Sequence, residues 1–364
     1  MKQKLIICYV YPDFGGVADY SKRIESIYRS WKDTTLHEVV VKANMSPIDL
    51  SKAIIATNAD VVHFEMGGSD WKMYAASRQL LERAPKVRQI VTIHDTGIIL
   101  SHPSGWILPP GRTPLLVLLK TIRIFLEKIM RLTVLSSWIK DKRITLIALR
   151  EHALPGLTYL PHVLIEETIP TSERDKNKIF TIGFVGYWSP NKGIETLIEA
   201  YNQIRGRHDI ELQLKIYGGP AGDEDNFSKK IRAMVQGRKD IVLCGKIPDG
   251  GLPQTIANLN LIALPYWLDN PAGSSGIAIH SALSGTPAVS SRAPQLVETF
   301  GGGANYYSPA DDKDALAAAL VGVINQYQKA LIKAEKLQSR IVSERSIKVI
   351  GERLRKIYLE NSII

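Results

Sequence analysis

The chain has 364 residues, 45% of them hydrophobic and 23% charged, and its formal net charge is +10. This length is enough for two domains with full-sized cores, and the composition is ordinary for a globular protein. The two cysteines, Cys8 and Cys244, exclude a disulfide framework and favour a reducing compartment. We recognise neither a secretory signal nor an apolar run of the ~18 residues that a membrane span needs. We therefore expect a cytoplasmic protein that contacts a membrane from one side at most.

The first half of the chain alternates between predicted strands and predicted helices. Apolar runs bounded by glycine, proline or polar residues predict strands, and apolar residues at helical spacing predict helices. The expected strands are 5–11, 37–43, 59–67, 88–95, 132–137, 145–149 and 157–164, and the expected helices are 17–28, 74–81 and 115–129. The polar stretch PTSERDKNK at 170–178 follows, and its proline, serine and mixed charges are typical of a domain boundary.

A second series of strands and helices occupies the rest of the chain. The expected strands are 179–186, 211–219, 240–245, 261–266 and 287–291, and the expected helices are 193–204, 227–235, 252–259, 312–327 and 332–359. The predicted organisation is a first domain at 1–168, a linker at 169–178 and a second domain at 179–342. A C-terminal helix at 343–364 is expected to pack back toward the first domain.

The repeated alternation predicts an α/β protein with two Rossmann-like domains, each with a doubly wound parallel sheet, that face each other across a cleft. In such sheets, ligands bind at the carboxyl ends of the strands. Residues at predicted strand ends or just after them are therefore candidates for the site: Gly15, Gly16, Glu65, His94, Asp95, Gly186, Gly218 and Gly219. We expect them to converge on the cleft.

The segment NPAGSSGIAIHSALSGTPAVS at 270–290 carries the most functional information. It places a Gly/Ser-rich loop directly before a short apolar helix, and backbone N–H groups at a helix N-terminus bind phosphate readily. Ser274, Ser275 and Gly276 are thus candidate phosphate ligands, with a plain helix N-cap as the alternative. No Asp or Glu lies between Asn270 and Gln295, so a mechanism here works without a local carboxylate.

A basic stretch lies in the first half of the chain. Between Arg112 and Arg150, nine Lys/Arg residues stand against two acids, a bias that favours anionic partners. Residues 107–132 predict either a core helix with a solvated basic face or an element at a membrane surface. The basic residues alternate with aliphatic side chains rather than stacking aromatics, so we expect no nucleic acid as partner. An anionic membrane surface is the expected partner of residues 112–143.

Several of these segments, in this order, resemble a known family. GFVGYWSPNKGIETLIEAYNQI, beginning at Gly183, resembles the first strand–loop–helix of the C-terminal domain in retaining glycosyltransferases of family 4, which have the GT-B fold. LKIYGG, IVLCGKIP, LNLIALPY and SGTPAVSS resemble its later strands, and YPDFGGVADYSKRI resembles its N-terminal glycine loop. DVVHFEMG, VTIHDTG and LTVLSSWIK resemble further family segments, so that the resemblance covers nearly the whole chain.

The resemblance implies transfer of a sugar from a nucleotide-diphosphate sugar to a hydroxyl, with retention at the anomeric carbon and without a metal or other cofactor. Lys192 then occupies the place of the family's diphosphate-binding lysine, and Tyr187 the place of its arginine. His94 corresponds to the family histidine near the transferred sugar, and Gly15 and Gly16 to a loop near donor phosphate or acceptor. The implied acceptor is a glycan or a lipid-linked hydroxyl in surface polysaccharide, glycan or glycolipid synthesis.

The sequence departs from the family in the segment at 270–290. The family commonly carries two glutamates separated by seven residues, and counting back from Gly285 places them at Ala272 and His280. SSGIAIH resembles a variant with Ser-Gly followed by His, in which His280 hydrogen-bonds the ribose. The phosphate end of the site is thus expected to be intact, with altered contacts to sugar and ribose.

Simpler explanations exist for most of these residues. Lys192 is also compatible with a solvated loop lysine, Tyr187 with a packing role, His94 with a histidine satisfied by backbone, and His280 with a core position. Gly218 and Gly219 fit a plain turn, and Glu65 fits either a buried carboxylate paired with a base or an acceptor contact.

Two other functions also remain: a nucleotide-sugar epimerase with Glu65 and Asp95 as acid and base, and a non-catalytic GT-B protein that binds nucleotide. His63, His152 and His162 have no metal-ligand spacing.

Overall fold

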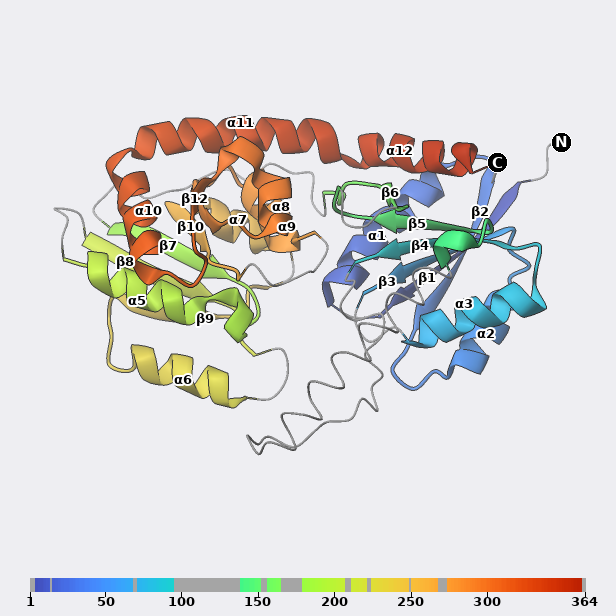
Figure 1. The fold of residues 1–364 in the computed structure, drawn as a ribbon, viewed down its shortest axis with the longest axis horizontal. Helices are drawn as coiled ribbons and strands as arrows, with labels where there is room; N and C mark the ends of the chain where they lie inside the picture. The colour runs from blue at the N-terminus through green and yellow to red at the C-terminus, as the bar shows by residue number, and fades with distance from the viewer. Residues whose placement is uncertain are drawn as a thin grey trace. The chain divides into compact units, whose positions relative to one another are not determined.

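The computed structural model describes residues 4–13, 15–67, 71–94, 138–151, 156–164, 179–206, 211–220, 224–248, 250–267 and 274–361. The chain divides into two units (Figure 1). Unit 1 is Met1–Val163 together with Ile347–Ile364, and unit 2 is Leu164–Ser346. Each unit contains a six-stranded sheet, and the pairings between the described strands are parallel.

Unit 1 has the strand order β2-β1-β3-β4-β5-β6. Its strands are β1 (Leu5–Pro12), β2 (Thr34–Val41), β3 (Val61–Met66), β4 (Arg88–Ile93), β5 (Ile144–Ala148) and β6 (Thr158–Tyr159). Its helices are α1 (Gly15–Ser30), α2 (Pro47–Ile55), α3 (Trp71–Arg83) and α12 (Ile347–Glu360). The C-terminal helix α12 contacts α1, although more than three hundred residues separate them.

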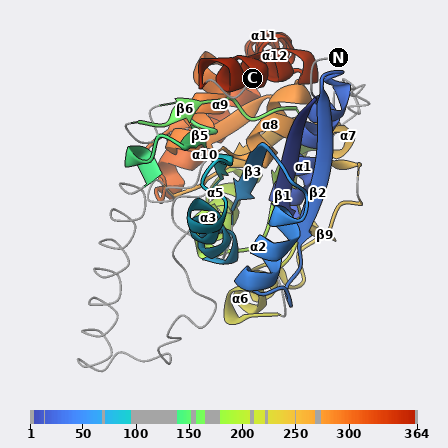
Figure 2. The same cartoon turned by 90° about the vertical axis from the view of Figure 1, so that its right-hand side faces the viewer.

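Alternating side chains of the unit 1 strands enter two separate cores. Cys8, Val62 and Phe64 pack with α2 and α3, which lie together on one side of the sheet (Figure 2). Ile7 and Val61, one residue out of step, pack with α1 and α12. Because successive side chains of a strand point to opposite faces, the two cores cover the two faces of the sheet. His63 and Glu65 share the parity of Val61 and so lie on the α1/α12 face.

Unit 2 has the strand order β12-β11-β10-β7-β8-β9. Its strands are β7 (Ile179–Val185), β8 (Glu211–Tyr217), β9 (Ile241–Gly245), β10 (Leu261–Leu264), β11 (Ala288–Ser291) and β12 (Asn305–Tyr307). The α-helices are α5 (Ile194–Ile204), α6 (Asn226–Val235), α7 (Leu252–Ala257), α8 (Gly276–Leu283), α9 (Pro294–Phe300), α10 (Lys313–Asn325) and α11 (Tyr327–Arg345), and the 3-10 helices are η1 (Pro190–Lys192) and η2 (Gly301–Gly303). One group of contacting helices contains α5, α6 and α10, and another contains α7, α8, α9 and α11 (Figure 1).

The strand predictions are confirmed to within three residues at either end wherever the structure describes them, with one exception. The predicted strand at 157–164 is wrong, because β6 comprises only Thr158 and Tyr159. Pro161 has no N–H to donate to a ladder, so the buried residues that follow it continue as irregular chain. The sequence analysis missed α2, α9 and β12, although Ser46 caps α2 through its side chain and Pro47 begins it.

The single helix predicted at 332–359 is also wrong, because α11 and α12 are separate helices. Ser346 between them has an extended backbone, with φ −61° and ψ 156°. The apolar residues of α11 pack in the core of unit 2, and those of α12 pack in a core of unit 1. The prediction of one straight helix with one apolar stripe did not include this change of core. Among the described residues no single helix is long and apolar enough to cross a membrane, whereas the bent pair α10 and α11, at 94° to each other, meets the same criteria of length and composition.

Candidate functional site

The carboxyl ends of β7 and β8 in unit 2 are packed backbone against backbone. Gly186 N donates to Tyr217 O at 3.3 Å, and Trp188 N donates to Gly219 O at 2.8 Å. Gly218 has φ +111°, and a Cβ at that position would lie 1.9 Å from the carbonyl oxygen of Gly186. Glycine is therefore required at 218 for both its backbone conformation and this close approach. The predicted site glycines 186, 218 and 219 thus lie together at one edge of the sheet.

Lys192 lies at the end of η1, held against the end of β10 by a hydrogen bond from Trp267 N to Asn191 O at 3.0 Å. Its ammonium nitrogen is 3.8 Å from the centroid of the Tyr266 ring. Burial lowers the pKa of Lys192 from 10.5 to about 8. Among the described residues no carboxylate forms an ion pair with it. Lys192 is therefore a partly desolvated cation that a ring quadrupole stabilises and that no carboxylate of the described residues balances.

Buried donors without hydrogen-bond partners in the described chain occur on the segments that carry Lys192 and Tyr266 and just before α8. Tyr266 Oη, Trp188 Nε1, Trp267 Nε1 and Ser274 Oγ are buried and make no hydrogen bond in the described part of the chain. Tyr266, 1% exposed, also lies beside Gly186, whose Cβ would be 3.8 Å from the hydroxyl. Burial raises the pKa of Tyr266, and the neighbouring Ser275 hydroxyl opposes this more weakly. Because buried polar groups are normally satisfied, this group of donors indicates a place for an acceptor-rich ligand.

The N-terminus of α8 adds further donors. Ser275 is the N-cap, and its side chain accepts a hydrogen bond from Ala278 N at 3.3 Å. Ser275 therefore does cap the helix, as the simpler explanation expects. The other N–H groups of the first turn have no partner within the helix, and the helix dipole favours an anion there. A Cβ at Gly276 would meet no atom within 4 Å, so this end of the helix is open.

The remaining donor-side predictions differ in exposure. Tyr187 is 56% exposed, whereas its neighbour Trp188 is buried and carries the Arg232 guanidinium 5.3 Å from its ring centroid. His280 is 5% exposed within α8, a degree of burial that fits a core histidine. The predicted contacts of Tyr187 with donor and of His280 with ribose stay predictions.

In unit 1, Glu65 and His94 form a hydrogen-bonded pair at the carboxyl ends of β3 and β4. His94 Nε2 lies 2.7 Å from Glu65 Oε2, and Tyr9 Oη donates to Glu65 Oε1 at 2.9 Å. His94 N donates to Met66 O at 2.7 Å, which places the histidine at the sheet edge. Of the two alternatives for Glu65, the buried carboxylate paired with a base is the one observed.

The glycines near this pair provide space and an open helix end. A Cβ at Gly67 would lie 2.7 Å from Val17 Cγ2 and 2.8 Å from His94 Cβ, so only glycine fits between α1 and His94. Gly15 and Gly16 form the first turn of α1, and a Cβ at either position would meet no atom within 4 Å. Glu65 and His94 therefore lie at one edge of the unit 1 sheet, next to the helix α1 that begins at Gly15.

Some predictions concern residues outside the described part of the chain. These are Asp95, Ala272, most of the basic segment 112–143 and the linker at 169–178.

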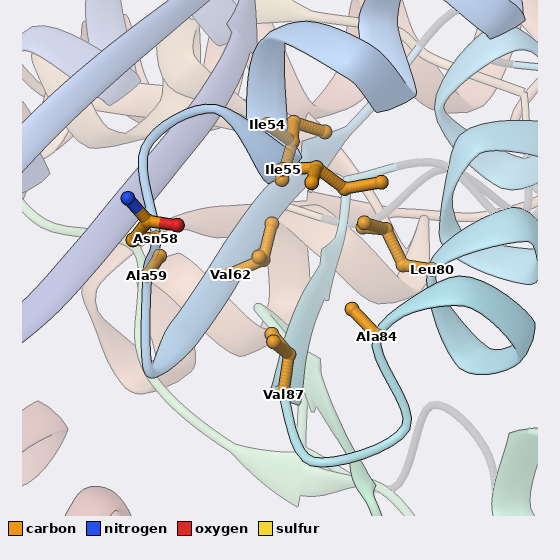
Figure 3. A pocket seen from close by; sticks show the side chains of 8 residues that line it. All are labelled: Ile54, Ile55, Asn58, Ala59, Val62, Leu80, Ala84 and Val87. Atoms are coloured by element: carbon orange, nitrogen blue, oxygen red, sulfur yellow. The ribbon is translucent and has the colours of Figure 1, made fainter.

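A pocket of about 230 Å³ lies elsewhere in unit 1 (Figure 3). Its lining is apolar except for Asn58 and comprises Ile54, Ile55, Asn58, Ala59, Val62, Leu80, Ala84 and Val87. Val62 and Val87 lie at the amino ends of β3 and β4, so the pocket is at the opposite end of these strands from Glu65 and His94. It is smaller than the 300–1,000 Å³ or so typical of ligand pockets and is not the candidate site.

Sequence comparison gives this geometry a family context. Residues 179–326 match the family Glycosyl transferases group 1. The matched residues include Lys192, Tyr266 and the N-terminus of α8. A curated relative, the MMP alpha-(1->4)-mannosyltransferase of Mycolicibacterium hassiacum, is 31% identical over 155 residues, which are 42% of this chain and 35% of the relative. The chain thus matches about a third of the length of that relative.

Solved structures share the whole fold. HepE from Anabaena in complex with UDP has a TM-score of 0.72 at 14% identity, covering 98% of this chain and 100% of HepE. Sucrose-phosphate synthase from Thermosynechococcus elongatus has a TM-score of 0.71 at 16% identity, covering 98% of this chain and 99% of that one. The predicted GT-B fold with two Rossmann-like domains is confirmed.

Several residues near Lys192 and Glu65 were not predicted from the sequence. Tyr266 lies at the end of the predicted strand 261–266, and that position was the available signal. Tyr9, Tyr28 and Tyr358 contribute hydroxyls to the surroundings of Glu65. No spacing in the sequence relates these three tyrosines, because they come from β1, α1 and α12.

Proposed function

We propose that the protein is a retaining glycosyltransferase that moves a sugar from a nucleotide-diphosphate sugar to a hydroxyl acceptor. The observation that carries the proposal is the Lys192 ammonium on the Tyr266 ring, which forms no ion pair with a carboxylate of the described residues, together with the buried Tyr266, Trp188 and Trp267 donors that have no partner in the same part of the chain. A diphosphate supplies negative charge and many acceptor oxygens, which is what this group of side chains lacks. HepE, a neighbour in fold, was solved with UDP and with UDP-glucose, which supports a nucleotide-sugar donor.

In the proposed reaction the diphosphate is the leaving group. Negative charge grows on it as the bond to the sugar breaks, and a preorganised cation with N–H donors stabilises that charge. Lys192 and the N–H groups near Ser274–Gly276 fill these roles, with Gly186, Tyr187, Gly218 and Gly219 at the same sheet edge. Binding of an anion favours the charged form of Lys192, whose pKa burial lowers to about 8. The proposal requires no metal and no cofactor, and the nucleotide sugar is a substrate.

The base for the acceptor hydroxyl is proposed to be the departing phosphate itself. The segment from Asn270 to Gln295 contains no Asp or Glu, so it provides no carboxylate nucleophile for a covalent glycosyl-enzyme. In unit 1, His94 is assigned contact with the transferred sugar, and Gly15, Gly16 and Asp95 are assigned to the acceptor side, whereas Glu65 is buried against His94 and is assigned no acceptor contact.

The acceptor is proposed to be a glycan or a lipid-linked hydroxyl in surface polysaccharide, glycan or glycolipid synthesis, with the protein on the inner face of the membrane. The basic sequence at 112–143 supports this proposal, because Lys and Arg attract anionic head groups. Replacing Lys120, Arg123 and Lys128 with Gln is expected to weaken sedimentation with vesicles that contain phosphatidylglycerol. Equal sedimentation of both proteins, or none of either, would contradict this part.

Two other functions fit the same fold. An epimerase needs acid and base groups that reach the sugar, and full burial of Glu65 between Tyr9 and His94 argues against it in this role. A non-catalytic nucleotide-binding protein is favoured by one observation, the absence of both family glutamates at Ala272 and His280. That function predicts binding without turnover.

The first experiment is a thermal-shift screen with UDP, GDP and ADP and with their glucose and mannose conjugates. A ligand that binds only the folded state raises the melting temperature by mass action. The donor that stabilises the protein is then used in a transfer assay with lipid-linked and free glycan acceptors, and product stereochemistry is read by NMR. Sugar transfer with retention supports the proposal. Stabilisation by a nucleotide without transfer favours the non-catalytic function, and no stabilisation by any of them contradicts both.

A further inference from the structure

The Glu65 carboxylate lies entirely inside unit 1, at 0% exposure. An ionised carboxylate in such a place is costly unless hydrogen bonds and an opposite charge balance it. Tyr9 Oη and His94 Nε2 lie within 2.9 Å of its two oxygens, one on each. No Lys or Arg of the described chain forms an ion pair with it. Glu65 therefore depends on a nearby imidazole.

His63 is the second histidine in contact with Glu65, but both of its ring nitrogens have other hydrogen-bond partners. Its Nε2 is 3.3 Å from Glu65 Oε1 and only 2.7 Å from Thr92 Oγ1. Its Nδ1 is hydrogen-bonded to the Tyr28 hydroxyl, which lies 2.8 Å from that of Tyr358 on α12. Burial lowers the pKa of His63 to about 4, so it is neutral at pH 7. His94 is then the imidazole that is available as the hydrogen-bond partner of Glu65 Oε2.

The His94 ring has a second restraint besides Glu65. It packs edge-to-face with the Tyr20 ring, with 4.7 Å between centroids, and Tyr20 packs in the same manner on His162 at 4.9 Å. Burial and the nearby Glu65 charge raise the pKa of Tyr20, so this neighbour is uncharged at pH 7. One hydrogen bond and one ring contact thus restrain both the rotation and the tilt of the imidazole.

We propose that Glu65 is a positioning residue that orients His94. This proposal rests on the proposed function, in which His94 contacts the transferred sugar. A carboxylate only accepts hydrogen bonds, so the proton that His94 presents to it is on Nε2. The partner of one ring nitrogen decides what the other nitrogen offers. Glu65 thereby determines the protonation of His94 at Nε2 and the direction in which Nδ1 meets a substrate. Glu65 itself touches no substrate.

The variant Glu65→Gln tests this with little change in shape. An amide either places its N–H group toward His94, which moves the imidazole proton to Nδ1, or accepts from Nε2–H through its neutral oxygen. In the first arrangement the Nε2–H group is lost. In the second its hydrogen bond is weaker, because charge-assisted hydrogen bonds are about twice as strong as neutral ones. Both arrangements change the same observable, the Nε2–H proton of His94.

The experiment is ¹H–¹⁵N NMR of the ligand-free, histidine-labelled full chain, with circular dichroism and thermal melting to show that each variant is folded. A proton engaged with Glu65 exchanges slowly and gives a downfield resonance, which His94→Gln identifies by its loss. In Glu65→Gln this resonance is expected to disappear or move upfield. Tyr9→Phe is the matched control, because it removes the donor to Oε1 and leaves the bond from His94 to Oε2. We expect it to keep the resonance.

Kinetics on the donor found by the screen complete the test. Glu65→Gln is expected to lower kcat by about 10- to 100-fold, the scale seen when a group that orients an imidazole is removed, with little change in the donor KM. A resonance unchanged in Glu65→Gln, or absent from the parent protein, would overturn the proposal. So would a normal kcat in Glu65→Gln. The NMR result is independent of turnover, so a parent protein that transfers no sugar contradicts the proposed function and leaves the Glu65–His94 bond to be judged by NMR alone.

Discussion

The two units carry opposite kinds of electrostatics at the carboxyl ends of their sheets. Within the described part of unit 2, Lys192 is a cation without a paired carboxylate, and Tyr266, Trp188 and Trp267 have buried donors without partners. In unit 1 the acid Glu65 and the base His94 are bound to each other. The first arrangement is incomplete without a ligand, whereas the second is complete within the protein.

This difference suggests that the unit 2 site serves to bind a ligand, whereas the unit 1 site serves to hold a side chain in a fixed orientation. Unpartnered buried donors lower stability in the free protein and gain hydrogen bonds when an acceptor arrives. A paired acid and base in a low-dielectric interior keep their geometry whether or not a ligand is present. Substitutions in the two sites should therefore have different consequences: in unit 2 they should affect ligand binding and transfer more than folding, and in unit 1 they should affect folding as well.

The largest expected effect comes from Lys192→Ala. If the ammonium stabilises the leaving diphosphate, kcat/KM for the donor falls by about 10²–10³-fold, the loss typical of a group that stabilises charge in the transition state. The matched control is Lys230→Ala, because Lys230 is an exposed lysine on α6 paired with Glu195. An unchanged kcat/KM in Lys192→Ala would contradict the role of Lys192 as a ligand of the diphosphate, and with it the binding role assigned to unit 2.

The pH dependence of stability should report the same lysine. The folded-state pKa of Lys192 is about 8 and its ordinary value is 10.5, so between these values the unfolded chain binds more protons. The free energy of unfolding of the parent protein should thus rise relative to Lys192→Met as pH increases from about 8 to 10.5, by at most about 3 kcal/mol. Urea unfolding of both proteins at several pH values measures the difference. A constant difference across this range would show that the ammonium is well solvated.

Tyr9→Phe tests the completed site of unit 1. It removes the donor to Glu65 Oε1 and leaves part of a buried carboxylate without a hydrogen bond. The free energy of unfolding is expected to fall by about 1–3 kcal/mol. Urea denaturation measures this, and an unchanged stability would mean that Glu65 does not need the Tyr9 hydroxyl.

Tyr266→Phe is the same substitution in the other site and has the smallest expected effect. It keeps the ring next to Lys192 and removes a buried hydroxyl without a partner, so stability should stay the same or rise. Nucleotide affinity should weaken by about 2- to 10-fold, the value of one hydrogen bond. Tyr201→Phe is the control, because that hydroxyl donates to Leu212 O at 2.8 Å and serves folding alone. A marked loss of stability in Tyr266→Phe would show that the Tyr266 hydroxyl contributes to folding, as the Tyr9 hydroxyl of unit 1 is expected to do.

Much of the fold was predictable from local patterns. Runs such as LIICYVY at 5–11 and IFTIGFVG at 179–186 are strands in the structure because buried parallel strands need continuous apolar sequence. The break at Ser346 was not predictable, because the helical pattern continues through it and only packing on different cores separates α11 from α12. The strand prediction at 157–164 was wrong because it did not take into account that Pro161 has no N–H to donate to a neighbouring strand.

The sites were predictable by position and not by contact. Strand ends marked Gly186, Glu65 and His94 as lying at a sheet edge, because parallel strands bring their carboxyl ends to one edge. Lys192 was identified from the family resemblance instead. Which side chains touch there depends on register and on neighbouring elements. Nothing local relates Lys192 to Tyr266, although their contact gives the ammonium its setting.

By itself the sequence determined the two α/β series, the glycines that let backbones meet at Gly218, and the absence of acid between Asn270 and Gln295. These are properties of local periodicity, backbone sterics and composition. The tertiary structure decided that Lys192 is partly desolvated against the Tyr266 ring and that Glu65 is buried against His94. Charge states and hydrogen-bond partners depend on solvent exclusion by residues distant in sequence, and only the packed chain provides that.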